Sequence, residues 1–332
     1  MNESDVEFYE IDQSTPEGAQ ESFDSSDTDA SRRLVQAYGE DIRHAQGIGW
    51  HVWDGKRWKP DKERKRLIEK AKQRACAWLE ECARSNNGDR DKLVKAACNL
   101  KNCNRIKAAV ELAESDPRIR LEADVFDADP WILNCESGII DLKTGELEQH
   151  DRNALCSKLA PVAFDPEAKH KALDTLLETI RATCGDDIPA FLSRCLGCCL
   201  TGDTSAESLF LLQGEGGAGK TTLLEAACAM LGDYAVKLPF ESFMLAKNGR
   251  GPGAASPDLI SLRGARLACA AEGDRTAAID AGTVKMLTGG ENVSARALYC
   301  SPIVFRPSWK LWLCSNYDPR CDADDSGLWR RI

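Results

Sequence analysis

The chain has 332 residues, of which 43% are hydrophobic, so it can bury the cores of two domains besides a tail. No stretch approaches about 18 uncharged apolar residues, and the N-terminus lacks the basic-then-apolar pattern of a secretion signal. These features argue against a membrane or exported protein, and we expect a soluble protein of the cytoplasm.

The acidic balance of the chain is confined to its first 30 residues. They hold ten Asp or Glu and no Lys or Arg, so they account for the whole net charge of -10. Because they are also poor in apolar residues, we expect residues 1–30 to be a disordered acidic tail. The tail is either a solubilising leader or a DNA mimic that competes for the protein's own basic surface.

Residues 31–153 are expected to form a smaller mixed α+β domain with a basic surface. From Arg43 to Lys107 there are 18 Lys or Arg against 8 Asp or Glu, and such a strip can meet phosphates. The expected elements are a helix over 31–46, a hairpin over 48–58, basic amphipathic helices over 61–84 and 89–114, and a β unit over 130–148 that turns at 143–145.

Three tryptophans surround the Asp54-Gly55 turn of the expected hairpin. Trp50, Trp53 and Trp58 interleave with basic residues, so they can stack on the bases of single-stranded DNA. Alternating aromatic residues on both arms of a turn are also typical of a packed hairpin. Both interpretations stay open, and we favour packing.

A linker and two helices follow. Residues 154–169 contain Pro161 and Pro166 and are expected to link the two domains. The expected helices over 170–200 include Cys195, Cys198 and Cys199. No second C-x-x-C or His pair lies near them, so we expect buried apolar thiols rather than zinc ligands. The 15 cysteines lack framework spacing, which is typical of reduced thiols in a cytosol.

The run Gly214-Glu-Gly-Gly-Ala-Gly-Lys-Thr221 fits the P-loop pattern G-x-x-x-x-G-K-[ST]. An apolar segment, 208–213, precedes it and a run of helix formers, 221–231, follows it, so the loop joins a buried strand to a helix. Backbone N–H groups of such a loop turn toward phosphate, and the helix N-terminus adds positive charge. The residues expected to bind a nucleoside triphosphate are Gly214, Glu215, Gly216, Gly217, Ala218, Gly219, Lys220, Thr221 and Thr222, with Thr221 also on Mg²⁺.

Polar residues end two further apolar segments. Segments 267–272 and 311–316 are predicted to be buried strands that end in Glu272 and Asn316. Glu272 is the expected catalytic base and orders the water bound to Mg²⁺, and Asn316 is expected to orient the attacking water. Arg330 and Arg331 are finger candidates, because a planar guanidinium stabilises phosphoryl charge, while one of them can instead serve a structural ion pair.

Residues 292–306 have two β-rich arms around a Cys-Ser-Pro turn, which predicts a hairpin. Charged residues on it are either solvated or in contact with nucleic acid, through contacts that carry no sequence information. The residues expected to supply phosphate contacts and one stacking ring are Lys285, Arg296, Tyr299 and Arg306.

Taken in order, these motifs resemble those of superfamily 3 helicases, and more narrowly the C-terminal ATPase of phage and plasmid primase-helicases. The resemblance covers roughly residues 31–332. It rests on the runs 214–222, 267–272, 284–291, 294–299, 305–307, 310–316 and 325–332, and on the upstream runs 47–58 and 134–146.

The resemblance implies an AAA-like α/β core over 170–332 that uses ATP with Mg²⁺. It implies a homo-hexameric ring that moves on single-stranded DNA at the replication forks of a phage, plasmid or integrated element in a bacterial host. In that family a hairpin faces the ring channel, and Arg330 or Arg331 would reach a neighbouring subunit. No carboxylate-and-His constellation for primase chemistry precedes the ATPase, so a primase would be a partner.

Two features depart from the family. Ala271 stands where many members carry a first acid, so Glu272 covers both roles or Asp274 assists. Family chains also continue past the Trp-Arg-Arg motif, whereas this one ends at Ile332, so we expect a truncated ATPase domain. Two other functions stay open: a P-loop ATPase that remodels protein, and a DNA-binding fragment without hydrolysis.

Overall fold

The computed structural model describes residues 26–84, 90–244, 257–271, 278–296, 302–317, 320 and 324–332. The chain divides into two compact units, one made of Met1–Ala37 and Lys70–Ala113 and the other of Tyr38–Glu69 and Glu114–Ile332. Most of the expected acidic tail, residues 1–25, lies outside the described residues. Its last four residues, 27–30, belong to the first helix, so the expected C-terminal bound of the disordered tail, residue 30, is wrong.

The first unit is helical. Trp78 and Cys82 pack with apolar residues of the following helix, and the Arg33 guanidinium lies 4.9 Å from the centre of the Trp78 ring. The helix expected over 89–114 is two helices, because the chain turns at residues 101–102. The helices are α1 (Asp27–Tyr38), α2 (Lys65–Arg84), α3 (Arg90–Leu100) and α4 (Cys103–Ala113).

A small sheet opens the second unit. The helix expected over 31–46 stops at Tyr38, and residues 42–45 form a strand because they pair with residues 49–52. The strands are β1 (Ile42–Ala45), β2 (Gly49–Trp53), β3 (Trp58–Pro60) and β4 (Arg120–Leu121), in the order β3-β2-β1-β4.

The tryptophans of this sheet pack inside the protein. Trp50 is 3% exposed and Trp58 is fully buried, and their ring N–H groups donate to Glu114 Oε1 and to the Arg152 carbonyl. Trp53 lies against Trp58, with 5.7 Å between ring centres. Packing is therefore confirmed for Trp50 and Trp58.

A three-stranded antiparallel meander follows where the sequence predicts a small β unit, and it turns at Gly145, within the predicted turn. The segment expected as a linker packs against it: the Ala160 N–H donates to the Asn134 carbonyl, and Cys156 and Ala160 are buried. The elements are η1 (Ala123–Val125), β5 (Ile132–Cys135), β6 (Gly138–Asp141), β7 (Leu147–Glu148) and η2 (Arg152–Ala154).

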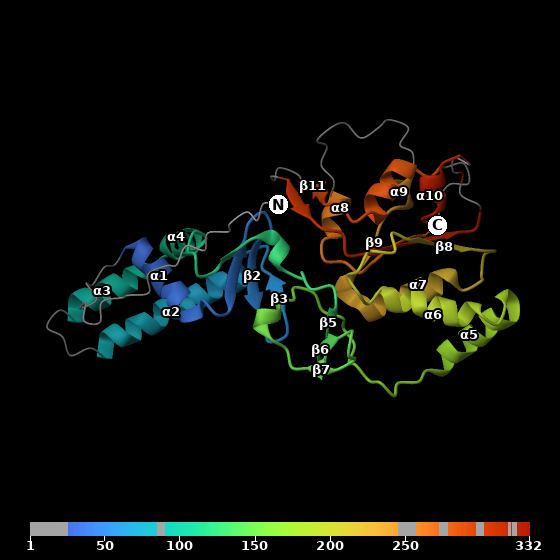
Figure 1. Cartoon of the computed structure of the whole chain (residues 1–332). Helices are drawn as coiled ribbons and strands as arrows, with labels where there is room; N and C mark the ends of the chain where they lie inside the picture. Colours follow the sequence, from blue (N-terminus) through green and yellow to red (C-terminus); the bar gives the residue numbers. More distant parts are fainter. Residues whose placement is uncertain are drawn as a thin grey trace, which may run out of the picture. The chain divides into compact units, whose positions relative to one another are not determined.

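The main sheet is parallel and four-stranded, in the order β8-β13-β10-β9. After β8 the chain passes through α7 to β9 at the far edge, and β13 later returns beside β8 (Figure 1). This is a mixed α/β fold built on a parallel sheet. Its parts are β8 (Leu209–Gln213), α7 (Lys220–Leu231), β9 (Ala235–Lys237), β10 (Leu267–Ala271) and β13 (Lys310–Ser315).

Alternation along the strands gives the sheet two apolar faces. Ala268 and Leu311 belong to a core with α8, α9, α10 and the β11–β12 hairpin, whereas Cys269 and Trp312 belong to a core with α6 and α7. In Figure 1, α8, α9 and α10 lie on one side of the sheet and α6 and α7 on the other. The covering elements are α5 (Lys171–Cys184), α6 (Ile188–Cys198), η3 (Gly232–Tyr234), η4 (Phe240–Phe243), α8 (Pro257–Ser261), α9 (Ala281–Thr288), β11 (Val293–Ala295), β12 (Ile303–Phe305) and α10 (Ser326–Trp329).

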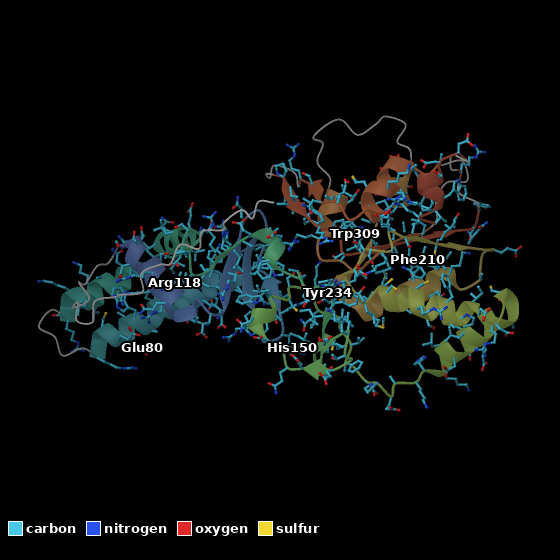
Figure 2. The ribbon with its side chains drawn as sticks, viewed as in Figure 1. Glu80, Arg118, His150, Phe210, Tyr234 and Trp309 are labelled. Carbon is cyan, nitrogen blue, oxygen red and sulfur yellow. The ribbon has the colours of Figure 1, made fainter. Side chains whose placement is uncertain are left out.

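A buried tyrosine directly before β9 joins the meander to the main sheet. Tyr234, labelled in Figure 2, is 1% exposed, and its hydroxyl accepts a hydrogen bond from the Asn134 N–H. Phe210, also labelled, lies 4.6 Å from Trp312 between ring centres. In the part of the chain that the structure describes, no helix has the length and apolar character that crossing a membrane would need.

The cysteines of α6 follow the expected pattern in part. Cys195 and Cys199 are buried, and the Trp312 ring N–H donates to Cys199 Sγ, whereas Cys198 is exposed. Within the described ranges, no group of three or more His, Cys, Asp or Glu side chains is placed to hold a metal ion. Two of the three thiols therefore serve as core residues.

Candidate active site

The glycine-rich loop leaves the carboxyl end of β8 and enters α7, as expected. Gly217 and Gly219 have φ angles of 86° and 81°, a region that residues with a Cβ rarely adopt. Gly219 is the N-cap of α7 and no side chain caps that helix, so the N–H groups of its first turn can donate hydrogen bonds to an anion. The exposed loop and helix residues are Glu215, Gly216, Gly217, Ala218, Thr221 and Thr222, and Gly214, Gly219 and Lys220 are half-buried.

Lys220 holds the loop together and meets the neighbouring strand. Its Nζ donates to the carbonyls of Gly214 and Glu215, at 2.7 and 2.9 Å, and to Asn316 Oδ1 at 3.0 Å. Residues 96 positions apart in the sequence are therefore in direct contact. The cation lies at the mouth of a loop of backbone donors, beside an amide that can orient a polar ligand.

Strand register explains this contact. Gln213 pairs with Ser315, and Cys314 pairs with both Leu212 and Ala271, so three strands end at the same edge. Asn316 is the next residue after β13, and Glu272 is the next residue after β10. Glu272 itself, with Asp274, lies outside the described residues.

The two candidate finger arginines differ in their contacts. Arg331 is 10% exposed in its side chain and donates to Glu207 Oε2 (2.7 Å), Thr288 Oγ1 (3.1 Å) and the Gly327 carbonyl (2.9 Å). Arg330 is 69% exposed and reaches the same Glu207 oxygen only at 3.5 Å. Arg331 is thus held inside its own chain, whereas Arg330 is directed to the surface.

Both arginines lie near the amino ends of the strands, which form the amino edge of the sheet, whereas the loop leaves the carboxyl end of β8. The Leu209 N–H, at the start of β8, donates to the Arg331 carbonyl at 2.6 Å. The glycine-rich loop begins after Gln213, at the other end of the same strand. Five strand residues span about 16 Å, so neither backbone position is next to Lys220.

The expected hairpin is confirmed in its arms, since Val293 pairs with Phe305 and Ala295 with Ile303. Arg296 and Arg306 are exposed, and Arg306 also lines a cavity of about 320 Å³ at the amino edge of the sheet. Lys285 Nζ instead forms an ion pair with Asp325 at 2.7 Å, and Tyr299 lies outside the described residues. The structure therefore brings two of the four expected DNA contacts to the exposed side of one hairpin.

Sequence reasoning missed the residues that hold the C-terminal segment. Glu207 accepts from Arg331, and Asp325 both pairs with Lys285 and accepts from the Leu328 N–H at the start of α10. The bonds from Lys285 and Leu328 hold the pKa of the Asp325 carboxyl below its usual value. Asp325, three residues before Leu328, had a detectable helix-cap pattern, whereas Glu207 had no local signal.

Two family models match the chain. Residues 31–182 match the family described as D5 N terminal like, and residues 212–331 match a family of unknown function, DUF5906. The second match includes the end of β8, the glycine-rich loop and β13.

Named relatives are viral. "Putative helicase L207/L206" of Acanthamoeba polyphaga mimivirus is 30% identical over 211 residues, covering 62% of this chain and 22% of the relative. "Putative helicase 022R" of Frog virus 3 (isolate Goorha) is 34% identical over 125 residues, covering 36% of this chain and 12% of the relative. This chain thus spans less than a quarter of the length of either relative.

Solved structures of the NrS-1 C terminal region give weaker likenesses. One apo structure (305-718) has a TM-score of 0.37 and 13% identity, covering 50% of this chain and 37% of that chain. An A form apo structure has a TM-score of 0.40 and 11% identity, covering 66% and 49%. The sequence matches thus show that residues 31–182 are similar to the D5 N terminal like family and that the chain is homologous to the two viral proteins named above.

Proposed function

We propose that this chain is the ATPase part of an ATP-dependent DNA helicase or translocase, of the superfamily 3 type with an AAA-like core. The observation that carries the proposal is the contact of Lys220 with Asn316 at the edge where β8, β13 and β10 end together. Ligands of open parallel sheets bind beyond the carboxyl ends of the strands. Homology to proteins named as helicases supports the same function.

The chain's own groups fit a nucleoside triphosphate. Lys220 Nζ now bonds two carbonyls and one amide oxygen, so it is placed to exchange these partners for phosphate oxygens. The uncapped N–H groups at the start of α7 add donors to the same place. Thr221 would hold Mg²⁺, which supplies charge neutralisation between the β- and γ-phosphates.

Hydrolysis would be an in-line attack of water on the γ-phosphate. Glu272 would take the proton of that water and order the water on the metal, and Asn316 would orient the attack from the neighbouring strand. In the chain's own strand register, both residues follow strands that end side by side. Positioning and charge stabilisation then supply most of the rate.

The place of the arginines favours an assembly. Arg330 is exposed and lies near the amino end of β8, away from the glycine-rich loop. A finger role for it therefore requires the phosphates of a second subunit. A ring of identical subunits supplies such an interface at each site. We propose a homo-hexamer on single-stranded DNA at the replication fork of a mobile or viral genome, with a primase as a separate partner; a bacterial host stays a prediction.

An ATPase assay with and without single-stranded DNA tests this function. We expect Mg²⁺-dependent hydrolysis that rises by about tenfold with DNA and falls steeply in salt. Hydrolysis without any response to DNA would favour an ATPase that remodels protein. DNA binding without hydrolysis would leave a DNA-binding fragment.

The hairpin provides the sharper arm of the test. Arg296→Ala and Tyr299→Ala should lose DNA stimulation and keep basal hydrolysis, because these residues lie on or between the hairpin arms. Ser294→Ala, an exposed change on the same strand, is the matched control and should respond as the parent does. Stimulation that survives both changes would place the DNA contact elsewhere, for example on the basic strip from Arg43 to Lys107.

A further inference from the structure

Two thiols touch inside the core that carries the candidate site. Cys228 Sγ on α7 and Cys269 Sγ on β10 are 3.3 Å apart. A disulfide needs about 2.05 Å, so an approach of about 1.3 Å would join them. Cys269 is 5% exposed and Cys228 is half-buried, so solvent reaches the pair from the helix side.

The surroundings make Cys228 the reactive member. The hydrogen bond from Cys269 lowers the pKa of the Cys228 thiol to about 7, against the effect of burial, and the nearby Lys237 lowers it further. Lys237 pairs with Cys269 across β9 and β10, and Glu225 partly offsets its charge. Every other described cysteine with a shifted pKa has a raised one. These are Cys82, Cys156, Cys195, Cys199, Cys269 and Cys314. A thiolate is therefore favoured at Cys228.

We propose that Cys228 and Cys269 are a peroxide-reactive modification site that closes into a disulfide between α7 and β10. The Cys228 thiolate attacks one oxygen of hydrogen peroxide, the O–O bond breaks, and a sulfenic acid and hydroxide form. Cys269 Sγ then attacks Cys228 Sγ, the S–O bond breaks, and the leaving hydroxyl takes the Cys269 proton as water. Two thiols are oxidised to one disulfide, and one peroxide is reduced to two waters.

The link joins the two elements that bear the nucleotide site. Cys228 follows Lys220 by about two helical turns on α7, and Cys269 is three residues before Glu272. A bond between them fixes the distance of the phosphate-binding helix from the strand of the expected base. We expect oxidation to slow ATP hydrolysis reversibly, and only this effect on turnover rests on the proposed function.

Peptide mapping tests the link itself. The whole chain is treated with hydrogen peroxide, blocked with N-ethylmaleimide and digested with trypsin without reductant. Peptides 221–237 and 267–275 each hold a single cysteine, so the expected product is this pair joined, with a loss of two hydrogens, and separated by dithiothreitol. Recovery of both peptides as unlinked adducts, or linked to other cysteines, would overturn the proposal.

Variants then test the consequence. Peroxide should lower the ATPase rate of the parent by about tenfold, with recovery in dithiothreitol, and should raise its melting temperature. Cys228→Ser and Cys269→Ala should keep their ATPase rates when peroxide is added. Cys195→Ser removes a buried thiol of α6 and should lose activity in peroxide as the parent does. If Cys269→Ala fails to fold, the half-buried Cys228→Ser decides.

The outcomes separate the two proposals. If peroxide joins the two peptides but leaves the ATPase rate unchanged, the disulfide is supported and its expected effect on hydrolysis is overturned. An untreated chain without ATPase activity would contradict the proposed function, while the peptide pair would still decide whether the thiols react.

Discussion

The main sheet has a carboxyl edge, where its parallel strands end, and an amino edge, where they begin. The cations at these two edges are bound in different ways. At the carboxyl edge, Lys220 bonds the carbonyls of an exposed glycine-rich loop and the amide of exposed Asn316. At the amino edge, Lys310 is 8% exposed and donates to the Thr201 carbonyl and hydroxyl. One lysine can exchange its partners for a ligand, and the other completes the fold.

The difference extends to the arginines of the amino edge. Arg266 is 1% exposed, donates to the Asp129 carbonyl at 2.9 Å and occupies the space where Gly202 lacks a Cβ. Burial lowers the pKa of this guanidinium. Its two terminal nitrogens donate to main-chain carbonyls, which offsets part of the cost of burying the charge, whereas its Nε has no hydrogen-bond partner among the described residues. Charge type alone therefore does not identify a ligand site; solvent access and exchangeable partners do.

The largest effect should come from exchanging the two lysines for alanine. Lys220→Ala should abolish hydrolysis and weaken ATP binding while leaving the fold intact, because the partners of its amine among the described residues are two carbonyls of the exposed loop and the exposed Asn316. Lys310→Ala should instead lower the melting temperature while the folded fraction still binds ATP. Nucleotide binding by titration calorimetry and thermal unfolding check both variants, and normal turnover in Lys220→Ala would remove the P-loop assignment.

The arginines should separate chemistry from folding in the same way. Arg330→Ala should lower turnover by about 10³-fold in the assembled protein and leave stability unchanged, whereas Arg331→Ala should cost about 1–3 kcal/mol of unfolding free energy. Mixing Lys220→Ala with Arg330→Ala subunits should restore part of the activity, because some interfaces then pair two intact residues. Co-assembled mixtures that stay inactive would argue against a finger that acts between subunits.

Much of the core was predictable because its signals are local. The strands around 208–213, 267–272 and 311–316 are apolar runs of strand length, and the run 214–221 fits the fixed spacing of the P-loop pattern. The strand order was not local, so the contact of Lys220 with Asn316 needed the structure. The close contact that buries Arg331 is made with Glu207, 124 residues earlier, which no pattern around the arginines contains.

The misses outside the core have the same origin. Residues 42–45 lie in a helical pattern but form β1, because tertiary pairing with β2 overrides propensity. The proline-bearing segment 154–169 has the pattern of a linker, yet its Ala160 forms a β-bridge with Cys135 of β5. Lys285, expected on DNA, forms an ion pair with Asp325, 40 residues later, and its DNA contact stays a prediction. The errors at 42–45 and 154–169 come from pairing partners that lie outside each segment.

A smaller effect on catalysis is expected from the polar residues at the carboxyl edge when Lys220 is left in place. Asn316→Ala should keep ATP binding and slow hydrolysis by about 10²-fold, since it removes one orienting group. Glu272→Gln should also keep binding and lose more of the rate, because an amide cannot take a proton. Single-turnover hydrolysis with parallel measurement of ATP affinity distinguishes these outcomes, and a normal rate in Glu272→Gln would move the base to Asp274 or another acid.

The smallest effect concerns the amino edge and is a stability that depends on pH. Burial lowers the pKa of Lys310 in the folded protein to about 8, from 10.5 in the unfolded chain, so between these values the unfolded chain binds more protons. Stability from this group is therefore present above pH 10.5 and is lost as the pH falls through about 8. Relative to Lys310→Met, which cannot titrate, the parent should gain about 1–3 kcal/mol in unfolding free energy between pH 7 and 10. Cys199, whose pKa is raised to about 12 mainly by burial, stays protonated in the folded form of both proteins across this range, so it does not contribute to the difference. Urea unfolding of both proteins across that range measures it, and parallel curves would mean that Lys310 keeps its ordinary pKa despite its burial, which would remove the contrast between the two edges.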